Sequence, residues 1–315
     1  MNRRRFGKRT RCDAVVAGVD LRGKAYAITG ANAGIGYETA RALASRGARV
    51  YLLCRHPLRG SLAAERIRRA HPGAWVEVLS LDLASLRSVR ACAKRFPERL
   101  LEGLIANAGV FGGSYRETED GFERTVGVCH FGHFALFLGL WERLRAAERP
   151  RLVVVSSGSH RSPPRLDFEH FLRPRERYRP LVAYGQAKLC NVLFAAEAQR
   201  RFGAEGLTAV SLHPGPLIAT DIGRDAWYAR LAIALARPFS RSVVQGAATS
   251  VYCATAPEVE EHGGGYFRDC APCLPSSEAR DPEVARRLWE LSEDLVARPP
   301  VLGAPVARAA PSPPA

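Results

Sequence analysis

The sequence lacks the features that mark membrane-spanning and secreted proteins. No apolar run approaches the roughly 20 residues that a transmembrane helix needs, and no apolar secretory segment follows the arginines at the N-terminus. The eight cysteines are scattered along the chain, which argues against a disulfide framework. We therefore expect no transmembrane segment and a cytoplasmic location. Residues 1–11 are rich in arginine and contain no acid, so a mitochondrial presequence is the alternative.

Lysine is scarce, so the formal net charge of +15 comes almost entirely from arginine. Arginine and alanine are abundant along the whole chain, which indicates a compositional bias rather than a cationic face built for nucleic acid. We expect no nucleic-acid partner. Cys270 and Cys273 have the spacing of a zinc or redox pair, but no second pair accompanies them. Packing is therefore the favoured interpretation, and no metal is expected.

The rest of the chain alternates short apolar runs with helical patterns. Such alternation predicts an α/β fold, a doubly wound parallel sheet of the Rossmann type. We predict a single domain over residues 20–297 with a helical lid between Pro214 and Arg241. Residues 1–19 are expected to form a disordered basic arm, and residues 298–315 a disordered tail rich in proline and alanine. The predicted strands are Ala25–Thr29, Val50–Cys54, Val76–Leu81, Leu100–Ala106, Leu152–Ser156 and Leu207–His213, with a short last strand near Tyr266. The predicted helices are Tyr37–Arg46, Ser61–Ala70, Leu86–Phe96, Glu119–Ala147, Ala183–Phe202, Gln245–Ala256 and Asp281–Ala297.

A glycine-rich turn between the first strand and the first helix indicates a nucleotide site. Gly30 permits a tight turn, Gly34 lets the backbone approach a bulky anion, and Gly36 lets the helix pack close to the strand. Free N–H groups at the start of the helix then face a pyrophosphate. The alternative is a turn that only connects two packed elements. The residues assigned to this part of the cofactor site are Gly30, Asn32, Ala33, Gly34, Ile35 and Gly36.

The second strand ends without the acid that holds the ribose 2′-hydroxyl of NAD. Arg55 stands there instead, and arginine suits the 2′-phosphate of NADP. We therefore predict NADP or NADPH as the cofactor and regard NAD as the less favoured alternative. After the third strand, Asp82 and Leu83 are placed to hold the adenine edge. After the fourth, residues Asn107, Ala108 and Gly109 are placed beneath the adenosine ribose.

Tyr184 and Lys188 lie four residues apart at the start of a predicted helix, so they share one helix face. An ammonium beside the phenol would lower the tyrosine pKa from about 10 toward neutrality. Such a tyrosine can give or take a hydroxyl proton while hydride moves to or from a nicotinamide. Ser157, at the end of the fifth strand, can orient the substrate oxygen; ordinary turn chemistry is the alternative for this serine.

With these motifs in this order, residues 20–297 resemble the short-chain dehydrogenase/reductase superfamily, and within it the retinol dehydrogenase-like branch. The resemblance implies that Tyr184 is the proton donor or acceptor, that Lys188 tunes it and holds the nicotinamide ribose, and that Ser157 binds the substrate oxygen. It also implies a homodimer through the long helices. Pro214 and Gly215 would lie along the nicotinamide, and Thr220 would reach its carboxamide or the phosphates. The residues that carry the resemblance are Thr29–Gly36, Asn107–Gly109, Ser157, Tyr184, Lys188 and His213–Gly215.

One position departs from the family pattern. Cys129 stands where the family usually has an asparagine that shapes its helix and anchors a water in the proton relay. Cysteine is a poor donor and acceptor. Two functions therefore stay open: an oxidoreductase acting on an apolar, retinoid-, steroid- or lipid-like carbonyl or alcohol, and a catalytically weak dinucleotide-binding protein that signals or scaffolds. Residues 1–19 contain no tryptophan, so a proline-binding WW module is not expected there.

Overall fold

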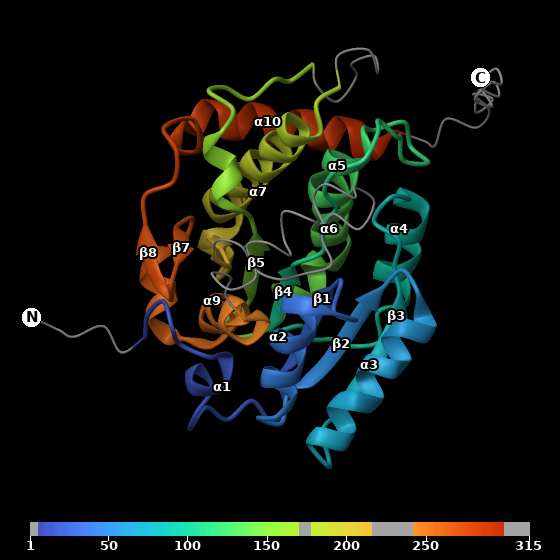
Figure 1. Ribbon diagram of the computed structural model, residues 1–315, viewed down its shortest axis with the longest axis vertical. Coiled ribbons are helices and arrows are strands. Elements are labelled where there is room, and N and C mark those ends of the chain that lie inside the picture. Colours follow the sequence, from blue (N-terminus) through green and yellow to red (C-terminus); the bar gives the residue numbers. More distant parts are fainter. Residues whose placement is uncertain (1–5, 170–177, 216–241, 299–315) are drawn as a thin grey trace, which may run out of the picture.

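A single twisted sheet organises the protein. The computed structural model describes residues 6–169, 178–215 and 242–298. In this part of the chain the eight strands follow the order β3-β2-β1-β4-β5-β6-β7-β8, and every neighbouring pair is parallel except β7 and β8. The predicted doubly wound fold is therefore confirmed (Figure 1). The strands are β1 Ala25–Thr29, β2 Arg49–Cys54, β3 Val76–Ser80, β4 Gly103–Ala106, β5 Arg151–Val155, β6 Thr208–His213, β7 Tyr266–Arg268 and β8 Ala271–Cys273.

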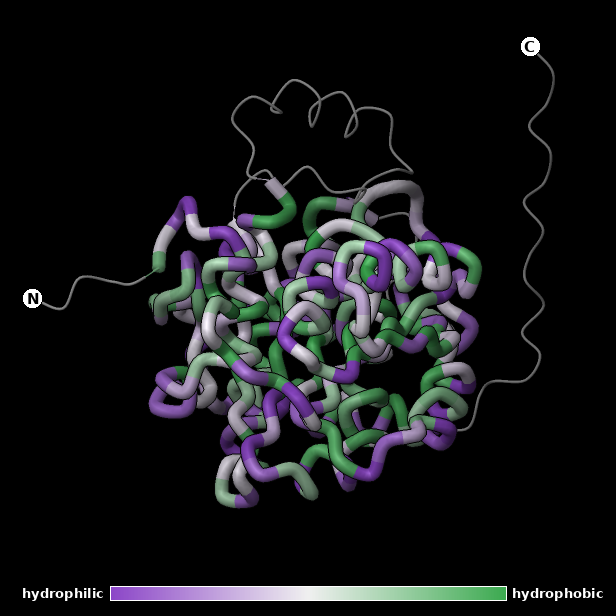
Figure 2. Tube along the Cα trace, turned by 90° about the horizontal axis from the view of Figure 1, so that it is seen from below, coloured by the Kyte–Doolittle hydropathy of each residue, from purple (hydrophilic) through white to green (hydrophobic). Residues whose placement is uncertain are grey.

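Helices cover both faces of the sheet. Helices α4, α6, α7 and α10 contribute to the core on one face, and α1, α2, α3 and α9 to the core on the other. Hydrophobic segments gather in the interior between these layers, while many loops at the periphery are hydrophilic (Figure 2). The helices are α1 Cys12–Val15, α2 Gly34–Ala44, α3 Pro57–Ala70, α4 Leu86–Arg95, α5 Arg124–Val126, α6 Gly132–Leu144, α7 Pro180–Phe202, α9 Val243–Thr255 and α10 Pro282–Ala297.

The topology fixes where ligands can bind. Strands β2 and β4 flank β1, so the chain winds outward in opposite directions from this point. Ligands of doubly wound sheets bind outside the carboxyl ends of the strands at such a reversal. The glycine turn follows β1, and residues 107–109 follow β4. Both segments therefore lie at the expected crevice.

The predicted long helix Glu119–Ala147 differs from the structure. It is divided into α5, a π-helical turn Gly127–Phe131, and α6. A β-carbon on Gly132 would lie 2.5 Å from the Leu83 carbonyl oxygen. The glycine thus allows the chain to approach the end of β3 where the turn ends. A periodic apolar pattern gives no warning of such a turn, since one extra residue barely alters it.

The N-terminal segment also differs from expectation where the structure describes it. Residues 1–19 were expected to be disordered, but helix α1 forms within them, and Cys12, Val15 and Val16 are buried. Helix α1 packs on α9 and α2. Burial of these apolar side chains explains the order, because the segment supplies core residues rather than only charge. Residues 1–5, the predicted C-terminal tail from residue 299, and most of the predicted lid, residues 216–241, lie outside the described residues.

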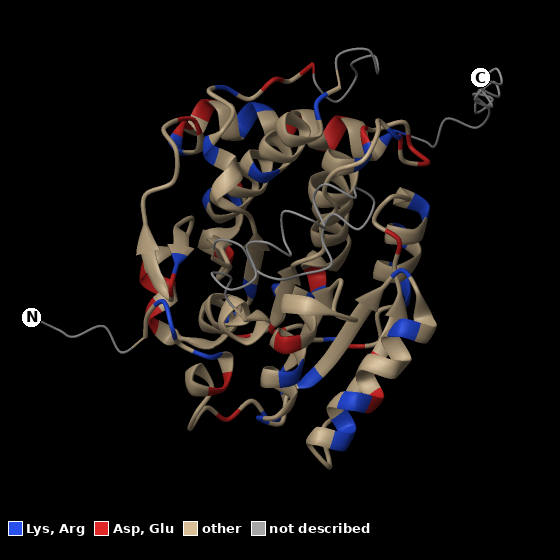
Figure 3. Ribbon diagram, viewed as in Figure 1, with Lys and Arg blue, Asp and Glu red and all other residues tan. Residues whose placement is uncertain are grey.

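Lys and Arg are spread over many elements, with several along α3 (Figure 3). Within the described ranges, no helix combines the length and apolar character required to span a membrane.

Candidate dinucleotide and catalytic site

The turn after β1 has the backbone geometry of a phosphate cradle. Gly30 and Gly34 have positive φ values of 65° and 59°, a region that favours glycine. A β-carbon on Gly36 would lie 2.5 Å from the Asn107 amide nitrogen and 2.7 Å from the Gly30 carbonyl oxygen. Helix α2 begins directly after Ala33, whose side chain provides no cap. Its first N–H groups are therefore available to an anion, and the residues present fit a dinucleotide.

A buried hydrogen-bond network supports this turn from below. The Thr29 hydroxyl oxygen accepts from the backbone nitrogens of Asn107 at 3.0 Å and Ala108 at 2.9 Å. The Asn107 amide donates to the Thr29 carbonyl at 2.8 Å. The Thr29 hydroxyl can therefore donate its proton to His133 Nε2, which lies 2.8 Å away. The ends of β1 and β4 are thus joined through side chains.

The remaining predicted cofactor residues on strands β2 and β3 lie at the same edge. Arg55 directly follows β2 and is exposed, with its Nε 3.3 Å from the ring of His56. Burial raises the pKa of the Cys54 thiol, at the end of β2, to about 11, although the nearby turn backbone at residues 31 and 32 acts to lower it. Asp82 follows β3, and its carboxylate accepts from the Ala84 nitrogen at 3.0 Å. Leu83 is buried beside it.

Ser157, Tyr184 and Lys188 are brought together by β5 and α7. The Ser157 hydroxyl lies close enough to the Tyr184 phenol to lower its pKa, and it accepts from the Ser159 backbone nitrogen at 3.2 Å. The Lys188 ammonium lies 5.6 Å from the centre of the Tyr184 ring and donates to the Val155 carbonyl at 3.0 Å. Gly109, which follows β4, lies next to this group, since a β-carbon there would be 3.5 Å from Lys188 Nζ. The predicted catalytic side chains therefore lie beside the end of β4.

The expected effect on the tyrosine needs correction. Burial raises the pKa of Tyr184 above its ordinary value, although the Lys188 ammonium and the nearby Ser157 hydroxyl both act to lower it. The expectation of a pKa near neutrality considered only the neighbouring charge. Desolvation of the phenolate is the larger effect here.

Cys129 occupies the π-helical turn with its sulfur toward the site. Its thiol donates to the Val110 carbonyl at 3.8 Å, and a β-carbon on Gly109 would lie 3.5 Å from the sulfur. The backbone carbonyl of Cys129 accepts from His133 Nδ1 at 3.0 Å. Cys129 therefore packs between backbone groups. It offers no amide to the site, as the asparagine that is usual in the family would.

The segment after β6 is described only at its start. Pro214 and Gly215 directly follow β6, and Gly215 has a φ of 119°. Thr220 and the remainder of the predicted lid lie outside the described residues.

Several residues that support the site were not assigned to it from the sequence. His130 and His133 are both buried and hydrogen-bonded. The part of His133 in linking α6 to the cofactor turn was missed, as was the contact of Phe111, whose ring lies 4.9 Å from that of Tyr184. His160 beside Ser157 was also missed. Only its proximity to Ser157 in the sequence could have signalled it.

The cysteine pair near the C-terminus has no ligand cluster around it. Cys270 lies in the turn between β7 and β8, and Cys273 ends β8. Among the residues that the structure describes, no group of three or more histidine, cysteine or acidic side chains is arranged to hold a metal ion.

The fold and the turn after β1 define a Rossmann-type, dinucleotide-binding class of protein. Comparison with known proteins narrows this class. A family model described as short chain dehydrogenase matches residues 24–166. WW domain-containing oxidoreductase from Danio rerio is 48% identical over 301 residues, which cover 93% of this chain and 73% of that protein. The chain belongs to the short-chain dehydrogenase/reductase family.

Two further similarities support the same assignment. Retinol dehydrogenase 12 from Mus musculus is 44% identical over 280 residues, covering 88% of each protein. The crystal structure of an uncharacterised protein from Mycobacterium Paratuberculosis has a TM-score of 0.72 and 35% identity, and the match covers 90% of this chain and 97% of that one. The resemblance stated from the motifs is therefore confirmed.

Proposed function

We propose that the protein is an NADP-dependent oxidoreductase that interconverts a carbonyl and an alcohol on an apolar substrate. The observation that carries the proposal is the convergence of Ser157, Tyr184 and Lys188 beside Gly109, at the edge of the sheet where the glycine turn lies. A bound nicotinamide would supply or accept the hydride. The side chains of the protein would supply the proton and orient the substrate.

Each side chain has a distinct part in this proposal. The Ser157 hydroxyl holds the substrate oxygen, and the Tyr184 phenol gives that oxygen a proton or takes one from it. Lys188 carries a positive charge near the phenol, which favours the phenolate form. Its bond to the Val155 carbonyl holds the ammonium at 3.0 Å from the end of β5. The glycine turn after β1, with Asn107 and Ala108, would hold the dinucleotide.

Tyr184→Phe tests the chemistry. The variant keeps the ring against Phe111 but removes the hydroxyl. With NADPH and a panel of apolar aldehydes and ketones, turnover should fall by at least about a hundredfold, the range expected for loss of a general acid. NADPH affinity, measured by fluorescence titration, should stay close to that of the unaltered protein. Turnover that persists in the variant would contradict the role of Tyr184.

The cofactor preference depends on Arg55. An exposed guanidinium at the end of β2 is suited to a 2′-phosphate, and no acid stands beside it in the sequence to hold a free ribose hydroxyl. Arg55→Asp should weaken NADPH binding by about tenfold to a hundredfold, as expected for loss of a charge-assisted hydrogen bond, and should improve NADH binding. An unchanged preference would show that Arg55 does not select the cofactor.

The substrate class follows from the relatives and from the expected lid. One relative is named as a retinol dehydrogenase, so a retinoid-, steroid- or lipid-like carbonyl or alcohol is the proposed substrate. Thr220 is proposed to reach the cofactor from the lid, with Pro214 and Gly215 beside the nicotinamide. Crystals grown with NADP and soaked with a retinoid would reveal the lining of the pocket.

A second function is favoured by one observation. Cys129 places a thiol, not an amide, beside Gly109, and this thiol donates to the Val110 carbonyl. The chain could therefore bind the dinucleotide with little turnover and act as a signalling or scaffold protein. Cys129→Asn distinguishes the two proposals. An increase in turnover would show that the thiol limits an active enzyme. Cofactor binding without turnover, in both the original chain and the variant, would support the second function.

Assembly and location complete the proposal. A homodimer through the long helices would use the outer faces of α6 and α7. Helix α10 packs on α7 and occupies part of that surface, so any dimer of this kind must form beside α10. Light scattering of the purified protein measures the assembly, and microscopy of a tagged chain tests the proposed cytoplasmic location.

A further inference from the structure

The turn that carries Ser157 is held in place by His160, which follows Ser157 by three residues in the sequence. Ser157 precedes a short 3₁₀ helix, Gly158–Arg161. The Ser157 carbonyl accepts from the backbone nitrogen of His160 at 3.2 Å and from its ring Nδ1 at 2.7 Å. Because a carbonyl oxygen can only accept, Nδ1 carries the proton. The imidazole thus adds a second, shorter bond to the backbone of the substrate-orienting residue.

The other ring nitrogen reaches the C-terminal part of the domain. The backbone nitrogen of Ser276 donates to His160 Nε2 at 3.1 Å, so this nitrogen carries no proton. The Arg161 guanidinium donates to the Leu274 carbonyl in the same segment. His160 is fully buried, and its ring lies 4.8 Å from that of Tyr266 on β7. Burial lowers the pKa of His160, which favours the neutral ring that these two bonds require.

Two further contacts fix the turn from other directions. Gly158 N donates to His213 Nδ1, at the end of β6, at 3.2 Å. A β-carbon on Gly185 would lie 3.1 Å from the Ser159 carbonyl oxygen, so the glycine after Tyr184 lets α7 approach the turn closely. The turn is therefore enclosed by α7, β6 and the segment after β8, and the hydroxyl of Ser157 reaches Tyr184 from within this enclosure.

We propose that His160 is a positioning residue for the reaction: its neutral imidazole ties the Ser157 carbonyl to the backbone of Ser276 and thereby holds the Ser157 hydroxyl against Tyr184. This inference rests on the proposed function, since it concerns the geometry of the proposed catalytic group. It gives the segment after β8, more than a hundred residues from Ser157 in the chain, a direct effect on the site.

Two substitutions separate the two bonds of the ring. In His160→Asn, the amide nitrogen takes the place of Nδ1 and keeps the bond to Ser157, while the bond from Ser276 is lost. In His160→Gln, the amide oxygen takes the place of Nε2 and keeps the bond from Ser276, while the bond to Ser157 is lost. The glutamine variant should lose about tenfold to a hundredfold in kcat, the cost of a misplaced catalytic group. The asparagine variant should also lose kcat, but by a smaller factor, because the bond to Ser157 remains while the tie to Ser276 is gone. KM for NADPH should stay unchanged in both variants. His262→Gln, at an exposed histidine, is the control.

A second readout does not depend on turnover. The nearby Ser157 hydroxyl lowers the pKa of Tyr184, so His160→Gln, which loosens the turn that carries Ser157, should raise that pKa. NMR of ring-labelled tyrosine measures it, with Tyr184→Phe to identify the signal. Nitrogen NMR of the unaltered protein should show His160 protonated at Nδ1. If the unaltered protein has no turnover, the proposed function fails while both NMR tests still decide the inference. A proton on Nε2, an unchanged Tyr184 pKa in the glutamine variant, or equal losses of kcat in both variants that follow only their melting temperatures would overturn it.

Discussion

The two faces of the sheet are packed with different types of side chain. On the face covered by α4, α6, α7 and α10, the core is rich in aromatic rings, and Trp289 lies among several phenylalanines. On the face covered by α1, α2, α3 and α9, alanine and valine predominate. Small side chains allow helices to approach closely, and α2 must approach β1 closely for its first turn to face a phosphate. The aromatic face instead supplies a bulky support for α7, which carries Tyr184 and Lys188.

The contrast indicates that the cofactor and catalytic parts of the site have different physical supports. The cofactor part depends on close backbone approach, as at Gly36. The catalytic part depends on rings that fill space behind α7 and on buried polar side chains such as His133. Substitutions that make cavities should therefore be most damaging on one face, and substitutions that add volume on the other.

Removing the largest ring should have the largest effect. Trp289 is 2% exposed, and its ring lies 4.8 Å from that of Phe134 and 5.7 Å from that of Phe202. Trp289→Ala should lower the free energy of unfolding by about 3–5 kcal/mol through lost burial and a cavity. Urea unfolding measures the change. Trp75→Ala, at a ring that is 36% exposed, is the matched control and should cost clearly less. Equal losses at both positions would break the comparison.

Adding volume should act on the opposite face. Ala40 lies in α2 with no exposed surface. Ala40→Leu should destabilise the fold by about 1–3 kcal/mol, because the helix must shift to admit the larger side chain. NADPH binding should weaken as well, since the first turn of α2 moves with the helix. Ala70→Leu, at the exposed end of α3, adds the same volume without this strain. If Ala40→Leu changes stability but leaves cofactor affinity intact, close packing of α2 does not serve the cradle.

Acid should weaken the aromatic face through its buried histidines. Burial lowers the pKa of His133 to about 4, against about 6.5 for an exposed histidine. The stability that this neutral ring contributes is complete above pH 6.5 and falls as the pH drops toward 4. At pH 5 the loss should be about 2 kcal/mol for this residue. Urea midpoints at pH 7.5 and pH 5 measure it.

A variant identifies the histidine responsible. His133→Asn can still donate to the Cys129 carbonyl but does not titrate, so its stability should depend less on pH than that of the unaltered protein. An identical pH dependence in the two proteins would assign the effect to other groups, such as His130 or His160, whose pKa values burial also lowers.

The sequence predicted the features of this protein that depend on local backbone conformation, namely the glycine turn and most of the strands. Glycine spacing identified the turn after β1, and apolar runs located strands β1 to β6 within a few residues, because both signals are local. The short antiparallel strand β8 was not predicted. The π-helical turn at Cys129 and the raised pKa of Tyr184 were not predicted. The first depends on the close approach of Gly132 to Leu83, and the second on how much protein surrounds the phenol. Both are set by tertiary packing, as is the bond from Ser276 to His160.

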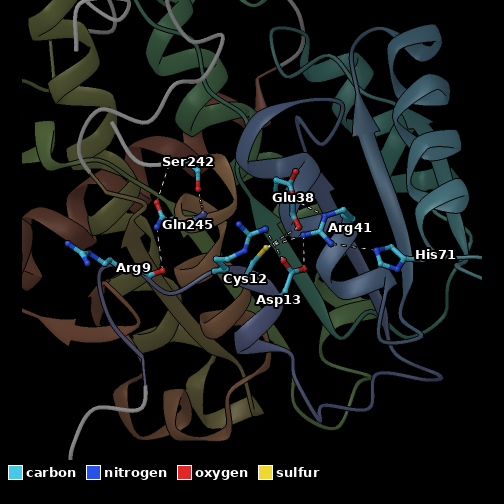
Figure 4. Close-up of polar contacts among 9 residues, drawn as sticks. Arg9, Cys12, Asp13, Glu38, Arg41, His71, Ser242 and Gln245 are labelled. Carbon is cyan, nitrogen blue, oxygen red and sulfur yellow. Dashed lines mark hydrogen bonds and ion pairs between the residues drawn. The ribbon is translucent and has the colours of Figure 1, made fainter. Parts of the chain in front are cut away.

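Ion pairs join the N-terminal segment to α2 on the face of small side chains. Removing them should give the smallest loss of stability among these predictions. The Arg41 guanidinium on α2 lies 2.7 Å from both the Asp13 and the Glu38 carboxylates, and its Nη2 contacts the Cys12 sulfur (Figure 4). Because the arginine side chain is only 16% exposed, Arg41→Met should cost about 1–2 kcal/mol. It removes the ion pair of Glu38 and leaves Asp13 with the longer, exposed pair to Arg11 at 3.7 Å.

The control for this prediction is Arg22→Met, which removes an equally short but solvent-exposed pair with Asp20. It should change the urea midpoint very little, because water and salt screen an exposed pair. Hydrogen exchange adds a local test: in Arg41→Met, the amides of α1 should exchange faster while those of α6 and α7 keep their protection. Faster exchange in α7 would mean that the two faces of the sheet do not respond independently, and this would contradict the comparison drawn between them.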